Sequence, residues 1–275
     1  MHMGETARRF GSVSERRVRG ENRRVSVLGK PKPPSGAVAP EPGNASFRAL
    51  RRADLALPAE VVARRLLGAF LVRSLDGEPP MVVRLVEVEA YLGDIDPGSH
   101  AYRGLTARNR VMFGEAGRAY VYFTYGNHFM LNVVAGREGR AAAVLLRGAE
   151  PVAGLEAMAR LRLSVRRPAK PPDRRQGEPP SRAYVRWLLG GPARLAAALG
   201  VDARDYGLDM VAGEAWPPPV GRALRLARGV PPEPGQVAVS GRIGLRRGGD
   251  LPLRFYVAGS AGVSPSRPER LPAPS

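Results

Sequence analysis

The chain has 275 residues, enough for one domain of about 200 residues and a tail. Its formal net charge is +18, almost all of it from arginine, which predicts a polyanionic partner, either nucleic acid or an acidic membrane surface. The absence of cysteine excludes disulfides, thiolate metal sites and cysteine nucleophiles, and no apolar run approaches the ~20 residues that span a bilayer. We expect a soluble, intracellular protein without a membrane partner.

Residues 1–45 are polar, rich in arginine and interrupted by prolines, with no helical or strand period. We expect this leader to be disordered. It is either a basic arm that contacts nucleic-acid backbone or a solvated extension, including a start codon placed too early. The folded domain is expected at residues 46–265, followed by a frayed tail at 266–275.

The expected elements follow from local signals. They are a helix from Pro58 to Gly68, strands at 69–74 and 82–91, a loop at 93–100, and a short helical segment at 108–110 capped by Thr106. Next come hairpin strands at 119–125 and 129–134, a strand at 141–148 and a helix at 154–163. A Pro/Arg-rich loop at 164–181, a helix at 191–200, and strands at 237–243 and 253–257 complete the series.

The strand at 82–91 carries unusual side chains for a half-buried sheet. Residues two apart share a face of a strand, so Glu87, Glu89 and Tyr91 are predicted on one face. Val86, Val88 and Ala90 are predicted on the other. The polar face is either solvated or lines a polar pocket.

The hairpin has two alternative registers. A two-residue turn at 126–127 would place Tyr122 and Asn132 on opposite faces, whereas a three-residue loop at 126–128 would set them opposite each other on one face. We favour the second register because it gathers polar groups on one side. Tyr125 then lies at the tip, as a wedge between bases or as an ordinary surface tyrosine.

Taken in order, eleven segments of the chain resemble the 3-methyladenine (alkyladenine) DNA glycosylase family, over roughly residues 47–265. These segments are Val86–Gly93, His100, Arg108–Arg110, Met112–Phe113, Tyr120–Tyr122, Tyr125–Gly126, Asn132, Val144–Arg147, Gly191–Leu195, Gly241–Gly244 and Leu253–Val257. The resemblance implies a single α+β domain around a curved, mainly antiparallel sheet. Helices would flank it, and a protruding hairpin would insert into DNA.

The same resemblance implies a monofunctional hydrolase of base excision repair, which flips an alkylated or deaminated purine out of duplex DNA. Glu89 would be the general base that activates water, and a carboxylate also stabilises the positive charge on the departing sugar. Arg147 and the backbone carbonyl of Ile243 would complete the cage around that water. Glu87 could repel Glu89 or pair with an arginine, and we favour the pairing.

The base pocket is implied in the same way. Tyr91, His100 and Tyr122 would form aromatic walls that attract cationic alkylated purines, and Asn132 would reject the exocyclic amine of guanine. Tyr125 would fill the gap left in the duplex. Arg108 and Arg110 would contact the DNA backbone.

Some expectations concern what the chain lacks. The three histidines have no ligand spacing, so neither a metal nor another cofactor is expected. No lysine lies near Glu89, which argues against lyase chemistry. Asn127 and His128 depart from the bulky residues that the family tends to carry there.

Two other classes of function compete with the glycosylase. A DNA-binding protein could keep the fold without activity, but it would have no need for Glu89 in a positive cleft. A membrane-surface protein would need a basic amphipathic helix. We expect a monomer, cytoplasmic in a bacterium or nuclear in a eukaryote, and the sequence does not rank the damaged purines.

Overall fold

The structure is a computed structural model that describes residues 47–265, except residues 125, 127, 166–167 and 217. The predicted leader and tail lie outside the described residues. The strands are β1 (Phe70–Ser74), β2 (Met81–Tyr91), β3 (Ala119–Thr124), β4 (His128–Val134), β5 (Ala143–Ala153), β6 (Ala223–Ala227), β7 (Val237–Ser240) and β8 (Arg254–Val257). The α-helices are α1 (Arg52–Leu55), α2 (Ala59–Leu66), α3 (Leu155–Leu163), α4 (Arg182–Leu189) and α5 (Pro192–Ala198). Short 3₁₀ helices are η1 (Gly93–Ile95), η2 (Arg110–Phe113), η3 (Ala203–Asp205) and η4 (Pro234–Gln236).

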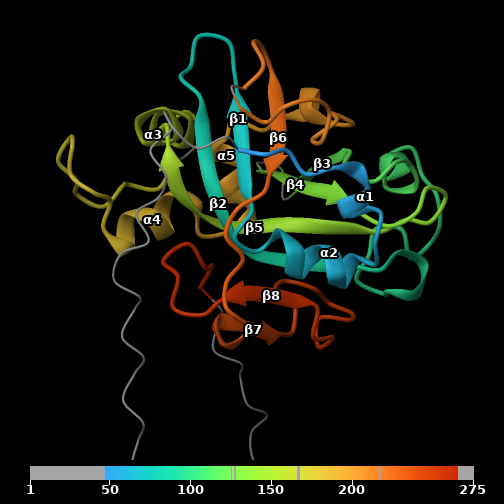
Figure 1. The fold of residues 1–275 in the computed structure, drawn as a ribbon. Coiled ribbons are helices and arrows are strands. Elements are labelled where there is room, and N and C mark those ends of the chain that lie inside the picture. Colours follow the sequence, from blue (N-terminus) through green and yellow to red (C-terminus); the bar gives the residue numbers. More distant parts are fainter. Residues whose placement is uncertain (1–46, 125, 127, 166–167, 217, 266–275) are drawn as a thin grey trace, which may run out of the picture. The chain divides into compact units, whose positions relative to one another are not determined.

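The described strands form one antiparallel sheet in the order β3-β4-β5-β2-β1-β6, with β8 on β2 and β7 on β8 (Figure 1). Every strand pair in it is antiparallel. The predicted α+β fold around an antiparallel sheet is therefore confirmed.

Strand β2 lies at the centre of this sheet and positions the polar residues. One of its edges pairs with β5. The other edge pairs with β1 near its beginning and with β8 over Glu87–Glu89. Strands thus cover both edges of β2 at Glu87 and Glu89, and both residues are buried, with 0% exposure.

A bulge in β2 interrupts the predicted alternation. The pairing with β5 shifts between Leu85 and Glu87 and again before Val88. Val83 and Leu85 consequently lie in the same apolar core as Val88 and Ala90, whereas Val86 lies outside it. An extra residue in one strand reverses the side-chain alternation beyond it. Val86 was therefore predicted wrongly to share a face with Val88 and Ala90.

Helices cover the core next to the central strands. Helix α2 begins after Pro58, where a fixed φ suits a helix start, and buries Val62, Ala63 and Leu66 while Arg64 points outward. Each fully buried Val or Leu side chain contributes about 1.5–3 kcal/mol. Helix α2 packs on β2 and β5, and α5 packs on β4 and β5.

Most predicted elements are present, but α1, α4 and β6 were not foreseen. Helix α4 begins at Ser181, whose hydroxyl accepts a hydrogen bond from the Tyr184 amide at 3.2 Å. Strand β5 extends to Ala153, beyond the predicted end at Gly148. The described residues between Ser164 and Ser181 contain no helix or strand, as expected for the Pro/Arg-rich loop.

The hairpin register differs from the prediction by two residues. Thr124 pairs with His128 and Tyr120 with Asn132, so residues 125–127 connect the strands and Tyr122 lies opposite Met130 rather than Asn132. This register adds the Thr124–His128 pair and brings the rings of Phe123 and Phe129 to 5.0 Å. A shift of two preserves the face, so Tyr122 and Asn132 still share one side of the sheet.

Candidate active site

Arg147 on β5 bridges the two buried glutamates of β2. Its Nε lies 3.1 Å from Glu87 Oε1, and its Nη1 lies 3.2 Å from Glu89 Oε2. Burial opposes the charge of the guanidinium, but the two carboxylates together hold the pKa of Arg147 above its usual value. Two predicted residues, Glu89 and Arg147, are thus in direct contact.

Both carboxylate oxygens of Glu87 accept hydrogen bonds from neighbouring protein groups. Its Oε1 accepts from Arg147, from Arg254 Nε at 2.7 Å and from the Ser264 hydroxyl at 2.7 Å. Its Oε2 accepts from the Ser264 amide at 2.6 Å. The predicted pairing of Glu87 with an arginine is confirmed, and two arginines take part. Glu87 joins β2, β5, β8 and the segment after β8.

Glu89 is held from three directions. The backbone amide of Ile243 donates to Oε1 at 2.8 Å, and the phenol of Tyr91 donates to Oε2 at 2.9 Å, next to Arg147. All three groups are hydrogen-bond donors directed at the oxygens of the Glu89 carboxylate. Ile243, whose carbonyl was predicted to help enclose the attacking water, thus lies beside Glu89 and contacts it through its amide.

The predicted pocket residues line one small cavity. It measures about 40 Å³. Its lining consists of Tyr91, Gly98, His100, Met112, Tyr120, Tyr122, Asn132, Ala143 and Leu245. The volume is enough for water but far below the 300–1,000 Å³ typical of ligand pockets. Four residues were predicted, and the other five were missed.

The aromatic walls of this cavity contact one another. The rings of His100 and Tyr122 are 4.6 Å apart and nearly perpendicular, and Tyr120 lies 5.4 Å from Tyr122. His100 Nδ1 lies 2.8 Å from the Tyr120 hydroxyl. Asn132 is buried and donates from Nδ2 to the carbonyl of Tyr120 at 3.0 Å. Tyr120, which sequence reasoning did not assign to the site, therefore supports two predicted residues.

His100 is held in its neutral form. The residue is solvent-exposed, but its ring packs against the rings of Tyr120 and Tyr122. This burial, followed by the nearby charge of Arg108, lowers the pKa of His100 to about 4. A neutral imidazole can stack and exchange hydrogen bonds without adding charge to the cavity.

The predicted DNA-backbone residues are solvent-exposed. The guanidinium carbon of Arg108 lies 5.1 Å from the ring centroid of Tyr122, so Arg108 borders the aromatic cluster. Arg110 is the first residue of η2 and is also exposed. Tyr125 lies outside the described residues, as does Asn127.

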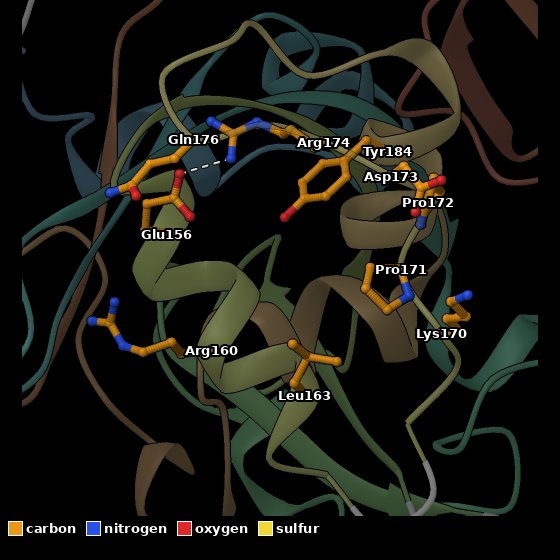
Figure 2. Close-up of a pocket in the computed structure, with 10 residues that line it drawn as sticks. All are labelled: Glu156, Arg160, Leu163, Lys170, Pro171, Pro172, Asp173, Arg174, Gln176 and Tyr184. Atoms are coloured by element: carbon orange, nitrogen blue, oxygen red, sulfur yellow. Dashed lines mark hydrogen bonds and ion pairs between the residues drawn. The ribbon is translucent and has the colours of Figure 1, made fainter.

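A larger cleft of about 500 Å³ involves none of the predicted site residues. Figure 2 shows it between α3, the chain at 170–176 and Tyr184, whose hydroxyl points into the space. The arginines along its wall already have partners, because Arg174 pairs with Glu156 at 2.7 Å and Arg160 with Glu78 at 2.5 Å. Its mixed charges indicate no particular chemistry.

The described residues lack two features that are typical of other classes of protein. No group of three or more His, Asp or Glu side chains there has an arrangement that could hold a metal ion. No helix in the same part of the chain is long and apolar enough to cross a membrane.

Comparison with known proteins gives a consistent result. The family model described as methylpurine-DNA glycosylase matches residues 53–261. A relative from Streptomyces avermitilis is 46% identical over 220 residues, which cover 79% of this chain and 92% of the relative. One from Koribacter versatilis is 42% identical over 231 residues, covering 83% and 99%.

A third relative, from Chlorobaculum parvum, is 40% identical over 210 residues, covering 76% of this chain and 88% of the relative. All three carry the provisional name of 3-methyladenine DNA glycosylase. The resemblance drawn from the sequence motifs is therefore confirmed. The chain belongs to the methylpurine-DNA glycosylase family.

Proposed function

We propose that this protein is a monofunctional DNA glycosylase that hydrolyses the N-glycosidic bond of alkylated or deaminated purines in duplex DNA and leaves an abasic site. The observation that carries the proposal is Glu89, a fully buried carboxylate bound by Tyr91 of the aromatic-lined cavity, in a protein with a net charge of +18. A protein that only binds phosphate gains nothing from a carboxylate there, because it repels the ligand.

The chemistry assigned to Glu89 is general-base catalysis. Glu89 accepts the proton of a water molecule as that water attacks the anomeric carbon, and its negative charge stabilises the oxocarbenium-like sugar. Tyr91 and the Ile243 amide fix the direction of the carboxylate. Arg147, held by both glutamates, and the carbonyl of Ile243 are assigned to orient the water.

The flipped base occupies the aromatic cavity. Tyr91, His100 and Tyr122 stack on its faces, and Asn132 excludes the exocyclic amine of normal guanine. Because the cavity is only about 40 Å³, a purine has to displace side chains at the rim as it enters. Extrusion is easiest for a weakly paired, damaged nucleotide, which contributes to selectivity.

The duplex binds through arginines and the hairpin. Arg108 and Arg110 are assigned to backbone phosphates, and their exposure supports this assignment. Tyr125 is assigned to the gap left by the flipped nucleotide, as a wedge between base pairs.

The test is base release from duplexes with a single hypoxanthine, a single ethenoadenine, or methylated purines. We expect free modified base and an abasic strand that hot alkali cleaves, with no cleavage before alkali because lyase activity is absent. Tight binding without base release on every duplex would instead support a protein that recognises damaged DNA without catalysis.

A further inference from the structure

A buried ion pair outside the sheet joins the two loops beside the cavity. Asp96 and Arg242 have side chains with 0% exposure, and their two contacts, Nη1–Oδ2 and Nη2–Oδ1, are both 2.6 Å. Removing two charges from water is expensive, and a hydrophobic pair often stabilises a fold as well or better. The pair therefore calls for an explanation other than stability.

The backbone contacts of the pair connect the loops at residues 92–100 and 240–250. Asp96 accepts from the amides of Leu92 at 3.1 Å and Gly98 at 2.9 Å. Arg242 donates to the carbonyls of Ala90 at 3.0 Å and Gly248 at 2.8 Å. The loops contribute Gly98, His100 and Leu245 to the cavity, so the pair fixes one side of it.

The two loops approach closely at Gly98, which lies against side chains of the second loop. A Cβ atom on Gly98 would lie 2.7 Å from Nη2 of Arg242 and 2.8 Å from Cδ1 of Leu245. A larger side chain at position 98 would therefore push against the Arg242 guanidinium. Two hydrogen bonds to Asp96 and two to backbone carbonyls fix the position of this guanidinium.

The position of the Arg242 guanidinium controls the two uncharged groups that donate hydrogen bonds to Glu89. Arg242 directly precedes Ile243, whose amide donates to Oε1. The guanidinium carbon of Arg242 also lies 4.6 Å from the ring centroid of Tyr91, whose phenol donates to Oε2. One guanidinium thus supports the two groups that set the direction of the carboxylate.

We propose that the Asp96–Arg242 ion pair is a positioning element for Glu89. Neither residue touches the substrate, and the pair acts through Tyr91 and Ile243. This inference rests on the proposed function for its effect on rate, but its effect on the Ile243–Glu89 hydrogen bond does not depend on that function. Misplacement of a catalytic group by about 1 Å costs on the order of 100-fold in rate.

A second buried ion pair, Arg73–Asp205, serves as a control for the Asp96–Arg242 pair. Arg73 and Asp205 also have side chains with 0% exposure and pair at 2.8 and 3.1 Å. Arg73 likewise donates to backbone carbonyls, those of Leu199 at 2.9 Å, Gly200 at 3.1 Å and Ala223 at 3.4 Å. None of these partners contacts Glu89. Loss of either arginine removes a buried ion pair together with its backbone hydrogen bonds, and only the contacts of Arg242 lead to the site. Asp205 keeps a second arginine partner, Arg222, when Arg73 is lost.

The experiment compares Arg242→Met with Arg73→Met, both at a temperature where circular dichroism shows them folded. Single-turnover base release and lesion-DNA affinity are measured for each. We expect Arg242→Met to lose about 10- to 100-fold in rate with affinity within about threefold, and Arg73→Met to stay within about threefold in both. Equal effects of the two variants on the rate would overturn the proposal.

A second readout is independent of activity. An amide that donates to a carboxylate has a strongly downfield proton resonance, so the Ile243 signal in a ¹⁵N-resolved spectrum reports this bond directly. We expect an upfield shift in Arg242→Met and in the milder Asp96→Asn, and none in Arg73→Met. An unchanged Ile243 signal in both site variants would contradict the proposal, even if the wild type released no base.

Discussion

The phenol oxygen of Tyr91 lies 2.9 Å from Oε2 of Glu89, two residues earlier on the same strand. The period of a strand places both side chains on one face. Burial, and then the charge of Glu89, raises the pKa of Tyr91 well above its usual value. The phenol therefore stays protonated and remains a donor throughout the physiological pH range.

Tyr91→Phe keeps the ring and removes only this donor. A hydrogen bond to a charged group contributes about 1.5–3 kcal/mol, so we expect single-turnover base release to fall about 10- to 100-fold. Affinity for lesion DNA should stay nearly constant because the stacking surface is retained. An unchanged rate would show that the phenol does not orient Glu89.

His100 should not titrate near neutral pH. Burial and the charge of Arg108 lower its pKa to about 4, below the ordinary value of about 6.5. Between about pH 4 and pH 6.5, the unfolded chain binds a proton at His100 more readily than the folded chain does. The contribution of His100 to stability is therefore present above pH ~6.5 and is lost as the pH falls toward 4.

NMR titration of the His100 ring checks this directly. We expect constant ring shifts from about pH 5.5 upward, where a histidine with the ordinary pKa would change. In Arg108→Gln the pKa should rise, because one nearby positive charge is gone. A titration of His100 near pH 6.5 in the wild type would disprove the neutral assignment.

Arg110→Gln should weaken DNA binding in a salt-dependent way. Loss of one phosphate contact is expected to reduce the slope of log affinity against log salt by about one, on damaged and undamaged duplex alike. Arg204→Gln is the control, because Arg204 is also exposed but already pairs with Asp202 at 2.7 Å. An identical slope change in both variants would mean that Arg110 has no specific place on the backbone.

Glu87→Gln should act on stability. The change leaves Arg147 and Arg254 buried without their shared counter-charge. Breaking a buried ion pair on one side costs about 3–5 kcal/mol. Urea denaturation should therefore show a large loss of unfolding free energy, and a loss below about 1 kcal/mol would contradict the structural role of Glu87.

Local sequence signals predicted the elements that have a clear boundary residue or a clear side-chain alternation. Pro58 and Gly68 bound α2, and alternation marked β2 and the hairpin strands. Helix α4 was missed because Tyr184 and Trp187 follow directly on a Pro/Arg-rich stretch that obscures the start at Ser181. Such a start is defined by a capping hydrogen bond rather than by composition.

Long-range pairing could not be predicted in the same way. The predicted loop at 126–128 and the observed register both put Tyr122 and Asn132 on one face, so the side-chain pattern could not choose between these two. The bulge near Val86 depends on how β5 lies against β2. Asp96 and Arg242 are 146 residues apart, and nothing local to either shows that they pair. The site residues of the sequence analysis came from the family resemblance instead.

The most direct test of the account is single-turnover base release by Glu89→Gln on a lesion duplex that the wild type cleaves, with binding measured on the same duplex. General-base catalysis is worth about 10²- to 10⁴-fold, so the account predicts a rate loss of that size with affinity within a few-fold of the wild type. A Glu89→Gln protein that binds the duplex and releases base at nearly the wild-type rate would contradict it.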